Sequence, residues 1–360
     1  MNTQTEIRTP SPSEARRPEA QKCVTIIFNP VSGKTDPEQR KKIISDTLAE
    51  HGYTYQYLET TKQEGAKALA EKAASKGIDL LAVSGGDGTV MEVLSALVGT
   101  NIPVAVLPAG TGNLLSVNLG IPMTVPEAVH VALSGRPYAL DLAKTGDDRY
   151  FAILGGMGLD AAMIHDADRK TKDKFGVLAY FVAAVKNLPR RRSRVSLRLD
   201  GGEPISHHAK SVVIANMGKI TGGLEAIPTA SPDDGKLDVG ILKAETLAQW
   251  LRLLGYAVLG RTHEAPDFDV YQARHIVLET SFPEPIQFDG EDGGRARKLT
   301  VEIVPKAVLV MLPEDAPAAQ DTPQTPDETA RRNALRPLLL IAGGLVLTGL
   351  VAWAIRRRRG

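Results

Sequence analysis

The stretch that most constrains the fold is residues 80–92, which read Leu-Leu-Ala-Val-Ser-Gly-Gly-Asp-Gly-Thr-Val-Met-Glu. An apolar run passes through a glycine-rich turn into a helical pattern, so we expect a strand, a tight turn and a helix. Gly85, Gly86 and Gly88 let a ligand approach the backbone closely, and the N–H groups that open the helix would face an anion. Asp87 could then hold Mg²⁺ beside a phosphate. A plain turn with a capping acid would explain the same residues equally well.

A strand–helix rhythm surrounds this stretch and predicts an α/β fold in the first third of the chain. The expected strands are residues 24–28, 54–60, 80–83 and 104–107, and the expected helices are residues 36–48, 64–76 and 89–97. Strands that alternate with helices favour a parallel sheet that is covered on both faces. Ligands of such sheets bind beyond the carboxyl ends of the strands.

Each of these four strands runs directly into a turn that is rich in glycine or hydroxyl residues. The turns are residues 29–34 (Asn-Pro-Val-Ser-Gly-Lys), 59–61 (Glu-Thr-Thr), 84–88 (Ser-Gly-Gly-Asp-Gly) and 108–113 (Pro-Ala-Gly-Thr-Gly-Asn). Because the carboxyl ends of parallel strands meet at one edge of a sheet, the four turns should lie together. Any single turn could be ordinary loop chemistry, but four together favour a nucleotide site.

The second half of the chain changes to short strand-like runs, which predict a mostly antiparallel domain. The runs are residues 150–154, 194–199, 211–215, 237–242, 275–278, 286–288 and 299–304. Residues 175–188 and 246–259 are the helical exceptions. The first is apolar enough to line a lipid pocket, although a core helix explains it as well. Arginines at positions 190, 191, 192 and 194 follow it, and they suit either a solvated surface or anionic lipid headgroups.

Composition narrows the class of partner. The chain has 360 residues, 43% of them hydrophobic, which allows two packed domains with tails. A formal net charge of +1 gives no bias toward nucleic acid, so we expect no nucleic-acid partner. Cys23 is the single cysteine, which excludes an internal disulfide, and its place beside an apolar run predicts a buried strand residue. The polar residues 1–21 predict a disordered N-terminus rather than a secretory signal.

The C-terminal region predicts a membrane anchor. Residues 338–355 are eighteen consecutive residues without a charge, which as a helix would be about 27 Å long against a hydrocarbon core of about 30 Å. We therefore expect a transmembrane helix at 337–355 and a basic tail at 356–360, with a buried soluble helix as the alternative. Residues 313–336 are rich in Pro, Ala, Asp, Glu and Thr and predict a disordered linker. Arginines flank both ends of the span, so the positive-inside rule does not orient it.

Five motifs, in their order along the chain, resemble those of the bacterial diacylglycerol kinase and lipid kinase family, which is related to sphingosine kinases. They are Asn29-Pro30-Val31-Ser32-Gly33, Gly85-Gly86-Asp87-Gly88-Thr89, Pro108-Ala109-Gly110-Thr111-Gly112-Asn113, Asp234-Gly235-Lys236-Leu237-Asp238 and Gln287-Phe288-Asp289-Gly290-Glu291. The resemblance covers about residues 22–312. The Gly-Gly-Asp-Gly-Thr motif alone also occurs in NAD kinases and phosphofructokinases, whereas the ordered set is much more specific.

The resemblance implies two domains with ATP and a lipid hydroxyl meeting in a cleft between them. The expected boundaries are residues 22–140 for an α/β ATP-binding domain of the NAD-kinase and diacylglycerol-kinase type, and residues 141–312 for a β-rich lipid-acceptor domain. By the same likeness, the residues around ATP would be Asn29, Pro30, Val31, Ser32, Gly33, Thr60, Gly85, Gly86, Asp87, Gly88, Thr89, Val90, Met91, Glu92 and Thr111. The Walker motif Gly-x-x-x-x-Gly-Lys-Ser/Thr does not occur in the chain.

The resemblance also assigns acidic residues to metal and proton chemistry. An Mg²⁺ network maps onto Asp87, Asp141 and Glu291. A second, structural Mg²⁺ site maps onto Asp234 with backbone carbonyls around Ser231 and Lys236. We expect Glu291 to accept the proton of the attacking hydroxyl, with Asp289 beside it, and these two roles could be exchanged.

Two positions depart from the family pattern. Leu114 stands where many relatives have an acid, and Met91 stands where many have an asparagine. The departures bear on the metal arrangement and on the acceptor, so three hypotheses stay open. The leading one is an ATP- and Mg²⁺-dependent lipid kinase for diacylglycerol or a related lipid, anchored at the cell membrane with its catalytic part in the cytoplasm, alone or as a homodimer. The others are a kinase for sphingoid bases or NAD, and a catalytically weak lipid-binding regulator.

Overall fold

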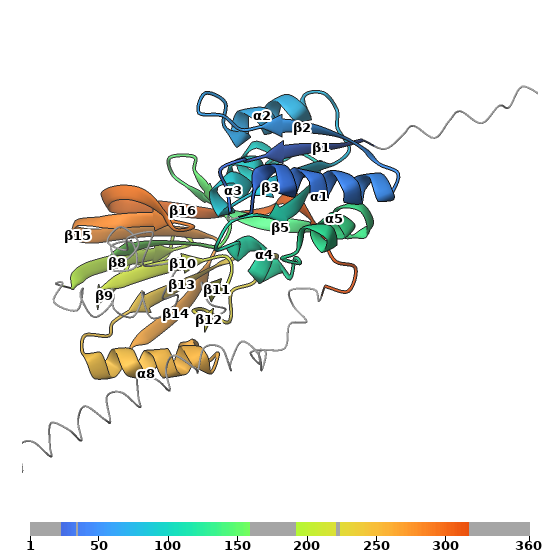
Figure 1. Ribbon diagram of the computed structural model, residues 1–360. Helices are drawn as coiled ribbons and strands as arrows, with labels where there is room; N and C mark the ends of the chain where they lie inside the picture. The colour runs from blue at the N-terminus through green and yellow to red at the C-terminus, as the bar shows by residue number, and fades with distance from the viewer. Residues whose placement is uncertain (1–22, 34, 159–191, 221–223, 317–360) are drawn as a thin grey trace, which may run out of the picture.

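The computed structural model describes residues 23–33, 35–158, 192–220 and 224–316. Figure 1 shows two lobes, an N-terminal lobe of helices and strands and a C-terminal lobe that consists mainly of strands. Fourteen strands of the described residues form one sheet that runs through both lobes, and two short strands form a second sheet. The lobes therefore share hydrogen-bonded backbone rather than a flexible joint.

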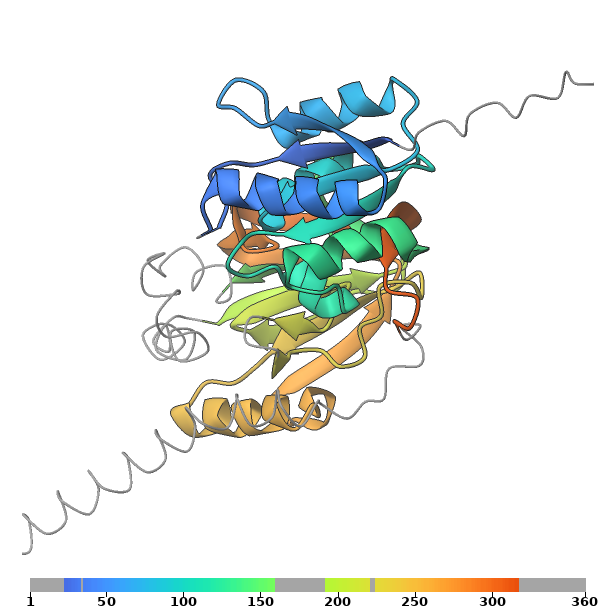
Figure 2. The same ribbon diagram turned by 45° about the vertical axis from the view of Figure 1, so that its right-hand side comes forward.

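The N-terminal lobe is a parallel sheet covered on both faces, as its sequence predicts. Its elements are β1 (Cys23–Phe28), α1 (Pro37–Glu50), β2 (Thr54–Glu59), α2 (Ala66–Ala74), β3 (Leu81–Gly85), α3 (Asp87–Ala96), β4 (Pro103–Pro108), α4 (Leu114–Leu119) and α5 (Val125–Ser134). The strand order is β2-β1-β3-β4, and every pair in it is parallel. Helices α2, α3 and α4 pack on one face of this sheet, whereas α1 and α5 lie side by side on the other (Figure 2).

Acidic side chains fix where two of these helices begin. Asp36 precedes α1, and its Oδ1 accepts a hydrogen bond from the backbone N–H of Gln39 at 3.0 Å. Helix α2 has no such cap from its own first residues. Glu92 of α3 supplies it instead, because its Oε2 accepts hydrogen bonds from the N–H groups of Ala66 at 2.8 Å and Lys67 at 3.3 Å. The sequence assigned Glu92 to the nucleotide, but the folded chain uses this carboxylate to join two helices.

The C-terminal lobe is mostly antiparallel, which confirms the fold class expected for it. Its elements are β5 (Arg136–Thr145), β6 (Tyr150–Phe151), β7 (Leu154–Gly158), β8 (Ser193–Leu199), β9 (Ile205–Ala209), β10 (Ser211–Ala215), β11 (Lys219–Ile220), β12 (Leu224–Glu225), β13 (Leu237–Leu242), α8 (Leu247–Val258), the 3₁₀ turn η1 (Thr262–Glu264), β14 (Phe268–Ala273), β15 (His275–Phe288) and β16 (Glu291–Leu312). Helix α8 begins with a capping box in which Thr246 and Gln249 satisfy each other's backbone N–H groups.

Strand β16 is the element that joins the two lobes. It pairs with β15 and β5 in antiparallel fashion, and its C-terminal end enters the N-terminal lobe beside β4 in parallel, with Leu309 opposite Pro103. The sequence predicted only residues 299–304 of this strand. The strand is 22 residues long, and a register shift between Val304 and Val308 interrupts its pairing with β5. The last strand of the described residues therefore completes the sheet of the first lobe.

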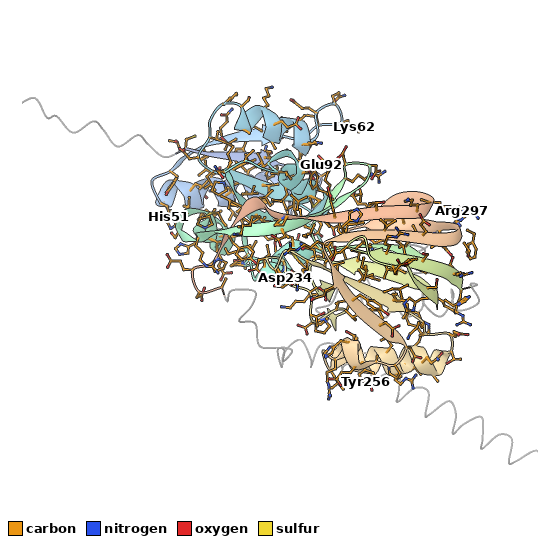
Figure 3. The ribbon with its side chains drawn as sticks, turned by 180° about the vertical axis from the view of Figure 1, so that it is seen from behind. His51, Lys62, Glu92, Asp234, Tyr256 and Arg297 are labelled. Carbon is orange, nitrogen blue, oxygen red and sulfur yellow. The ribbon has the colours of Figure 1, made fainter. Side chains whose placement is uncertain are left out.

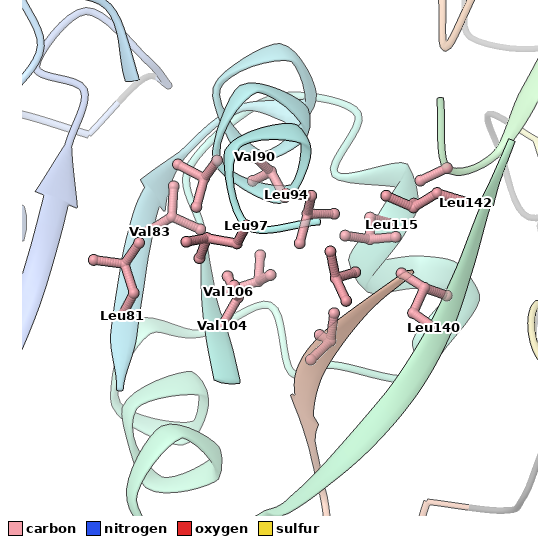
Figure 4. Packing of buried hydrophobic residues seen from close by; sticks show 14 of the residues in the cluster. Leu81, Val83, Val90, Leu94, Leu97, Val104, Val106, Leu115, Leu140 and Leu142 are labelled. Carbon is pink, nitrogen blue, oxygen red and sulfur yellow. The ribbon is translucent and has the colours of Figure 1, made fainter. Parts of the chain in front are cut away.

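Packing in the N-terminal lobe depends on this insertion. Figure 4 shows Val90 and Leu94 of α3, together with Leu97 at the end of this helix, packed over Leu81 and Val83 of β3. The same buried cluster includes Leu140 and Leu142 from β5 and Val308, Val310 and Leu312 from β16. Side chains about 200 residues apart in the sequence thus share one core, and each fully buried aliphatic side chain contributes roughly 1.5–3 kcal/mol.

Some sequence-based expectations need correction or fall outside the described residues. Cys23 is exposed and not buried, because β3 pairs with β1 only from Thr25 onward and leaves the first residue of β1 uncovered on that side. The predicted helix at 175–188 and the predicted span at 337–355 both lie outside the described residues. Among the residues that are described, none of the helices is long and apolar enough to cross a membrane.

We expect replacement of Leu94 by alanine to destabilise the chain strongly. Leu94 is fully buried in the cluster that α3, β3 and β16 share, so the change leaves a cavity that costs about 2–5 kcal/mol. Urea unfolding followed by circular dichroism measures this loss. Leu251→Ala on α8 is the matched control, because Leu251 is 39% exposed and its truncation should cost less than about 1 kcal/mol. Equal losses in the two variants would contradict this description of the core.

Candidate active site

The turns that follow β1 and β3 are bound to one another at the carboxyl edge of the parallel sheet. The backbone N–H of Asn29 donates to the carbonyl oxygen of Ser84 at 2.9 Å, and Asn29 Nδ2 donates to Thr89 Oγ1 at 2.8 Å. The N–H of Gly86 donates to Ser32 Oγ at 3.3 Å. These bonds bring together the two turns that the sequence singled out as a nucleotide site.

Glycine at two positions lets the turns approach backbone to backbone. A Cβ atom added at Gly33, whose φ is +86°, would lie 2.1 Å from the carbonyl oxygen of Ala109. A Cβ atom added at Gly110 would lie 2.8 Å from the Cα of Gly86. No larger residue fits at either contact without displacement of the backbone. The turns after β1, β3 and β4 therefore form one compact surface, with Thr60 next to it at the end of β2.

The residues that the sequence assigns to the nucleotide differ in their exposure to solvent. Val31 is 88% exposed and stands at the tip of the turn after β1. Val90 and Met91 belong to α3 and pack against the core of the N-terminal lobe, where Val90 is 4% exposed and Met91 is partly buried. Thr111 is exposed on the turn after β4. Of the four residues just named, Val31 and Thr111 are exposed to solvent.

Asp87 joins α3 to α4. It is the first residue of α3, and its Oδ1 accepts a hydrogen bond from the backbone N–H of Leu114 at 2.6 Å. Burial raises the pKa of Asp87, and the amides of Leu114, Leu115 and Asn113 oppose that rise. The other carboxylate oxygen lies against Gly112, where a Cβ atom would come within 2.8 Å of it. Leu114, which replaces an acid of the family pattern, contributes its backbone rather than its side chain.

Glu291 brings an acid from the C-terminal lobe onto the glycine turn. It is the first residue of β16 and is exposed. A Cβ atom added at Gly88 would lie 2.6 Å from Glu291 Oε1, so the carboxylate rests directly against the start of α3. A solvent-accessible carboxylate is thus held beside the turn that would bind phosphate.

Asp289, two residues away, is bound on both of its carboxylate oxygens. Oδ1 accepts hydrogen bonds from the N–H groups of Ile153 and Leu154 at 3.0 and 2.9 Å, and Oδ2 accepts one from Ala152 at 2.8 Å. Its φ of +47° belongs to the left-handed region, which favours the tight turn before β16. Burial raises the pKa of Asp289 to about 6, although the three amides lower it. This carboxylate anchors the turn that carries Glu291.

The remaining acids of the predicted metal sites gather where the lobes meet, near Asp234 in Figure 3. Asp141 is 1% exposed, and its carboxylate accepts hydrogen bonds from the N–H groups of Gly235 at 2.8 Å and Lys306 at 2.7 Å. Burial raises its pKa. Asp234 accepts from the N–H of Lys236 at 2.9 Å, and Ser231 Oγ donates to the carboxylate of the adjacent Asp233 at 2.9 Å. These residues therefore form a cluster separate from Asp87 and Glu291.

Within the described residues, the structure brings together no group of three or more His, Cys, Asp or Glu side chains that could hold a metal ion. Mg²⁺ does not require such a group, because it is usually held by one or two carboxylates together with substrate phosphates and water. Asp87 and Glu291, which both border the glycine turn, supply donors of this kind. The donor set therefore fits Mg²⁺ that arrives with a nucleotide.

Two family models match the chain over most of the described residues. The model "Diacylglycerol kinase catalytic domain" matches residues 23–145, and the model "YegS C-terminal NAD kinase beta sandwich-like domain" matches residues 155–312. The chain belongs to the bacterial diacylglycerol kinase and lipid kinase family. Membership makes it a kinase that transfers phosphate to an alcohol acceptor.

Curated relatives and solved structures agree with this membership. The chain is 29% identical over 311 residues to a diacylglycerol kinase of Mycobacterium tuberculosis, an alignment that covers 84% of this chain and 99% of the relative. It is 28% identical over 305 residues to a diacylglycerol kinase of Bacillus subtilis, covering 83% and 100%. A crystal structure of a diacylglycerol kinase from Bacillus anthracis superposes with a TM-score of 0.66 at 22% identity, covering 82% of this chain and 98% of that one, which shows the shared fold.

Sequence reasoning missed two contributors to the site of this kinase. Arg40 donates hydrogen bonds to carbonyl oxygens of the turn after β1. A signal for it existed, because Arg40 stands four residues before Ile44 and eight before Leu48, on the stripe of α1 that becomes buried. The backbone N–H of Leu114, which binds Asp87, left no such signal.

We expect Asp289→Asn to change how stability depends on pH. The folded kinase binds this proton more tightly than the unfolded chain, because the pKa rises from 3.8 to about 6 on folding. The contribution of Asp289 to the free energy of unfolding therefore decreases as pH rises from about 4 to about 6. Urea unfolding at several pH values from 4 to 7 should show that the stability difference between wild type and variant shrinks through this window.

Asp292→Asn serves as the control for that titration. Asp292 is exposed, and its Oδ1 accepts one hydrogen bond, from the N–H of Gly294 at 2.8 Å, which the asparagine oxygen can also accept. The variant removes one exposed carboxylate near Asp289 and therefore controls for the loss of an acidic side chain. A curve for Asp289→Asn that runs parallel to that of the wild type would show that Asp289 does not titrate differently in the folded chain.

Proposed function

We propose that this chain is an ATP- and Mg²⁺-dependent lipid kinase that phosphorylates a hydroxyl group of diacylglycerol or a related lipid. The observation that carries the proposal is the contact between Glu291 and Gly88. It sets an exposed carboxylate of one lobe beside a glycine turn at a helix start in the other. Phosphoryl transfer to an alcohol needs this pairing of a proton acceptor with a phosphate site.

The nucleotide would bind on the joined turns after β1, β3 and β4. Backbone N–H groups at the start of α3 favour a phosphate, because the amino end of a helix carries partial positive charge. Bound Mg²⁺ would supply charge stabilisation to the β- and γ-phosphates. Asp87 and Glu291 are the residues of the glycine turn region that would hold it.

Glu291 then acts on the acceptor. Its carboxylate takes the proton from the acceptor hydroxyl, whose oxygen forms the new bond to the γ-phosphorus while the bond to the departing ADP breaks. The three amides that hold Asp289 keep the turn before β16 in one conformation, which fixes Glu291 against Gly88. Asp289 is a positioning residue in this scheme, and Glu291 is the base.

We further propose that residues 337–355 anchor the kinase in the cell membrane, with the catalytic part on the cytoplasmic side where ATP is available. A linker of about 24 residues has a mean reach of roughly 25–30 Å, so the catalytic part could work at the bilayer to which it is tethered. The anchored kinase and its lipid acceptor would then diffuse in the same plane of the membrane. This arrangement is what favours a lipid over a soluble acceptor such as NAD.

The test is ATP-dependent phosphate transfer by the full chain to diacylglycerol, sphingoid bases and NAD in mixed micelles. We expect one lipid to accept phosphate, and Glu291→Gln to lower kcat by about 10²–10⁴-fold, since that is the usual effect of losing a general base. Asp292→Asn removes a neighbouring exposed acid and should retain wild-type kcat. Transfer to NAD alone would replace the lipid proposal, and binding of ATP without any transfer would favour the regulatory alternative.

A second prediction concerns the contact that carries the proposal. Gly88→Ala places a Cβ atom 2.6 Å from Glu291 Oε1, which is closer than these atoms can approach, so the carboxylate must move away from the glycine turn. We expect kcat to fall about tenfold or more, because small displacements of catalytic groups are costly. Stability should change by less than about 1 kcal/mol, since the exposed side chain can move. In a Glu291→Gln background the same substitution should have no further effect on kcat, and additive losses would refute the contact's role.

A further inference from the structure

Arg40 lies beneath the turn that follows β1. It is on α1, it is 2% exposed, and its Cζ stands 4.4 Å from the ring centroid of Phe28 at the end of β1. Nη1 donates to the carbonyl oxygen of Ser32 at 2.5 Å and Nη2 donates to that of Asn29 at 2.6 Å. The guanidinium therefore binds two carbonyl oxygens of the turn at once and connects the turn to α1.

The charge of Arg40 has no acidic partner among the described residues. The ion pairs that they form do not include Arg40, and burial is the one cause that lowers its pKa. Its Nε is buried without a hydrogen-bond partner. Arginine stays protonated in proteins, and a buried charge is normally balanced by an opposite charge nearby. Two carbonyl dipoles and a ring face balance this one only in part.

The same turn has a side that is open to solvent. Val31 at its tip is 88% exposed, and Gly33 is also exposed. Hydrogen bonds from Arg40 draw the carbonyl oxygens of Asn29 and Ser32 inward, so the negative ends of these peptide dipoles point away from a ligand on the open side. An anion bound there would be attracted by the guanidinium through the backbone of the turn.

We propose that Arg40 is a positioning residue for the nucleotide, and that the phosphates of ATP on the open side of the turn balance its buried charge. The inference rests on the function proposed above and adds an electrostatic element to it. Arg40 acts without contact with the nucleotide. Its charge is expected to favour ligands in proportion to the number of phosphates that they carry.

The experiment compares Arg40→Lys with Arg40→Gln in the full chain. Each replacement can donate to one turn carbonyl, and the two differ in charge. Isothermal titration measures the affinity of each variant for ATP, tripolyphosphate and adenosine. Arg261→Gln is the control for net charge, because Arg261 is an exposed arginine of the other lobe that pairs with Glu264. If Arg40→Gln does not fold, Arg40→Met takes its place, since it removes the charge without burying an unpaired polar group.

We expect ATP and tripolyphosphate to bind the lysine variant within about threefold of wild type, and the neutral variant about ten- to a hundredfold more weakly, as for the loss of one charged partner. Adenosine affinity should stay the same in all variants. Equal ATP affinities in the lysine and neutral variants would overturn the inference and would show that Arg40 only stabilises the turn. A parallel loss for adenosine would overturn it as well. A wild-type chain that binds neither ATP nor tripolyphosphate would overturn the proposed function with it.

Discussion

The parallel pairing of β16 with β4 is the constraint on which the rest of this structure depends. It closes the core of the N-terminal lobe with Val308, Val310 and Leu312, and it ties the two lobes into one sheet. Because β16 also begins at Glu291, the same strand places an acid of the C-terminal lobe against Gly88. One strand therefore couples the stability of the fold to the assembly of the active site.

Buried carboxylates that bind backbone amides hold the irregular segments around this sheet. Asp289 fixes the turn before β16, Asp87 fixes the start of α4, and Asp141 fixes the loop around Gly235 and the irregular part of β16. Burial raises the pKa of each, because desolvation disfavours the charged form. The amides partly offset this cost. The carboxylates of Asp87, Asp141 and Asp289 thus hold backbone segments in place, whereas Glu291 is exposed.

The surface formed by the turns after β1, β3 and β4 depends on backbone contacts and on a buried positive charge. Gly33 and Gly110 allow the turns after β1, β3 and β4 to touch through their backbones. Arg40 lies on α1 and donates hydrogen bonds to the carbonyl oxygens of Ser32 and Asn29 in the turn after β1. The Walker lysine motif is absent from the sequence. In the function proposed above, helix ends and this buried guanidinium would supply the positive field for a phosphate.

The sequence by itself determined the parallel character of the first lobe, the antiparallel character of the second and the glycine turns of the site, because hydrophobic period and turn chemistry are local properties. It also singled out Glu291 and Asp289, but it could not separate their roles. Only the tertiary structure decided that Asp289 is saturated by three amides while Glu291 meets Gly88, that Glu92 caps α2 and that Arg40 is buried. These facts depend on contacts between segments far apart in the chain, and local pattern carries no information about which distant backbone groups a side chain will meet.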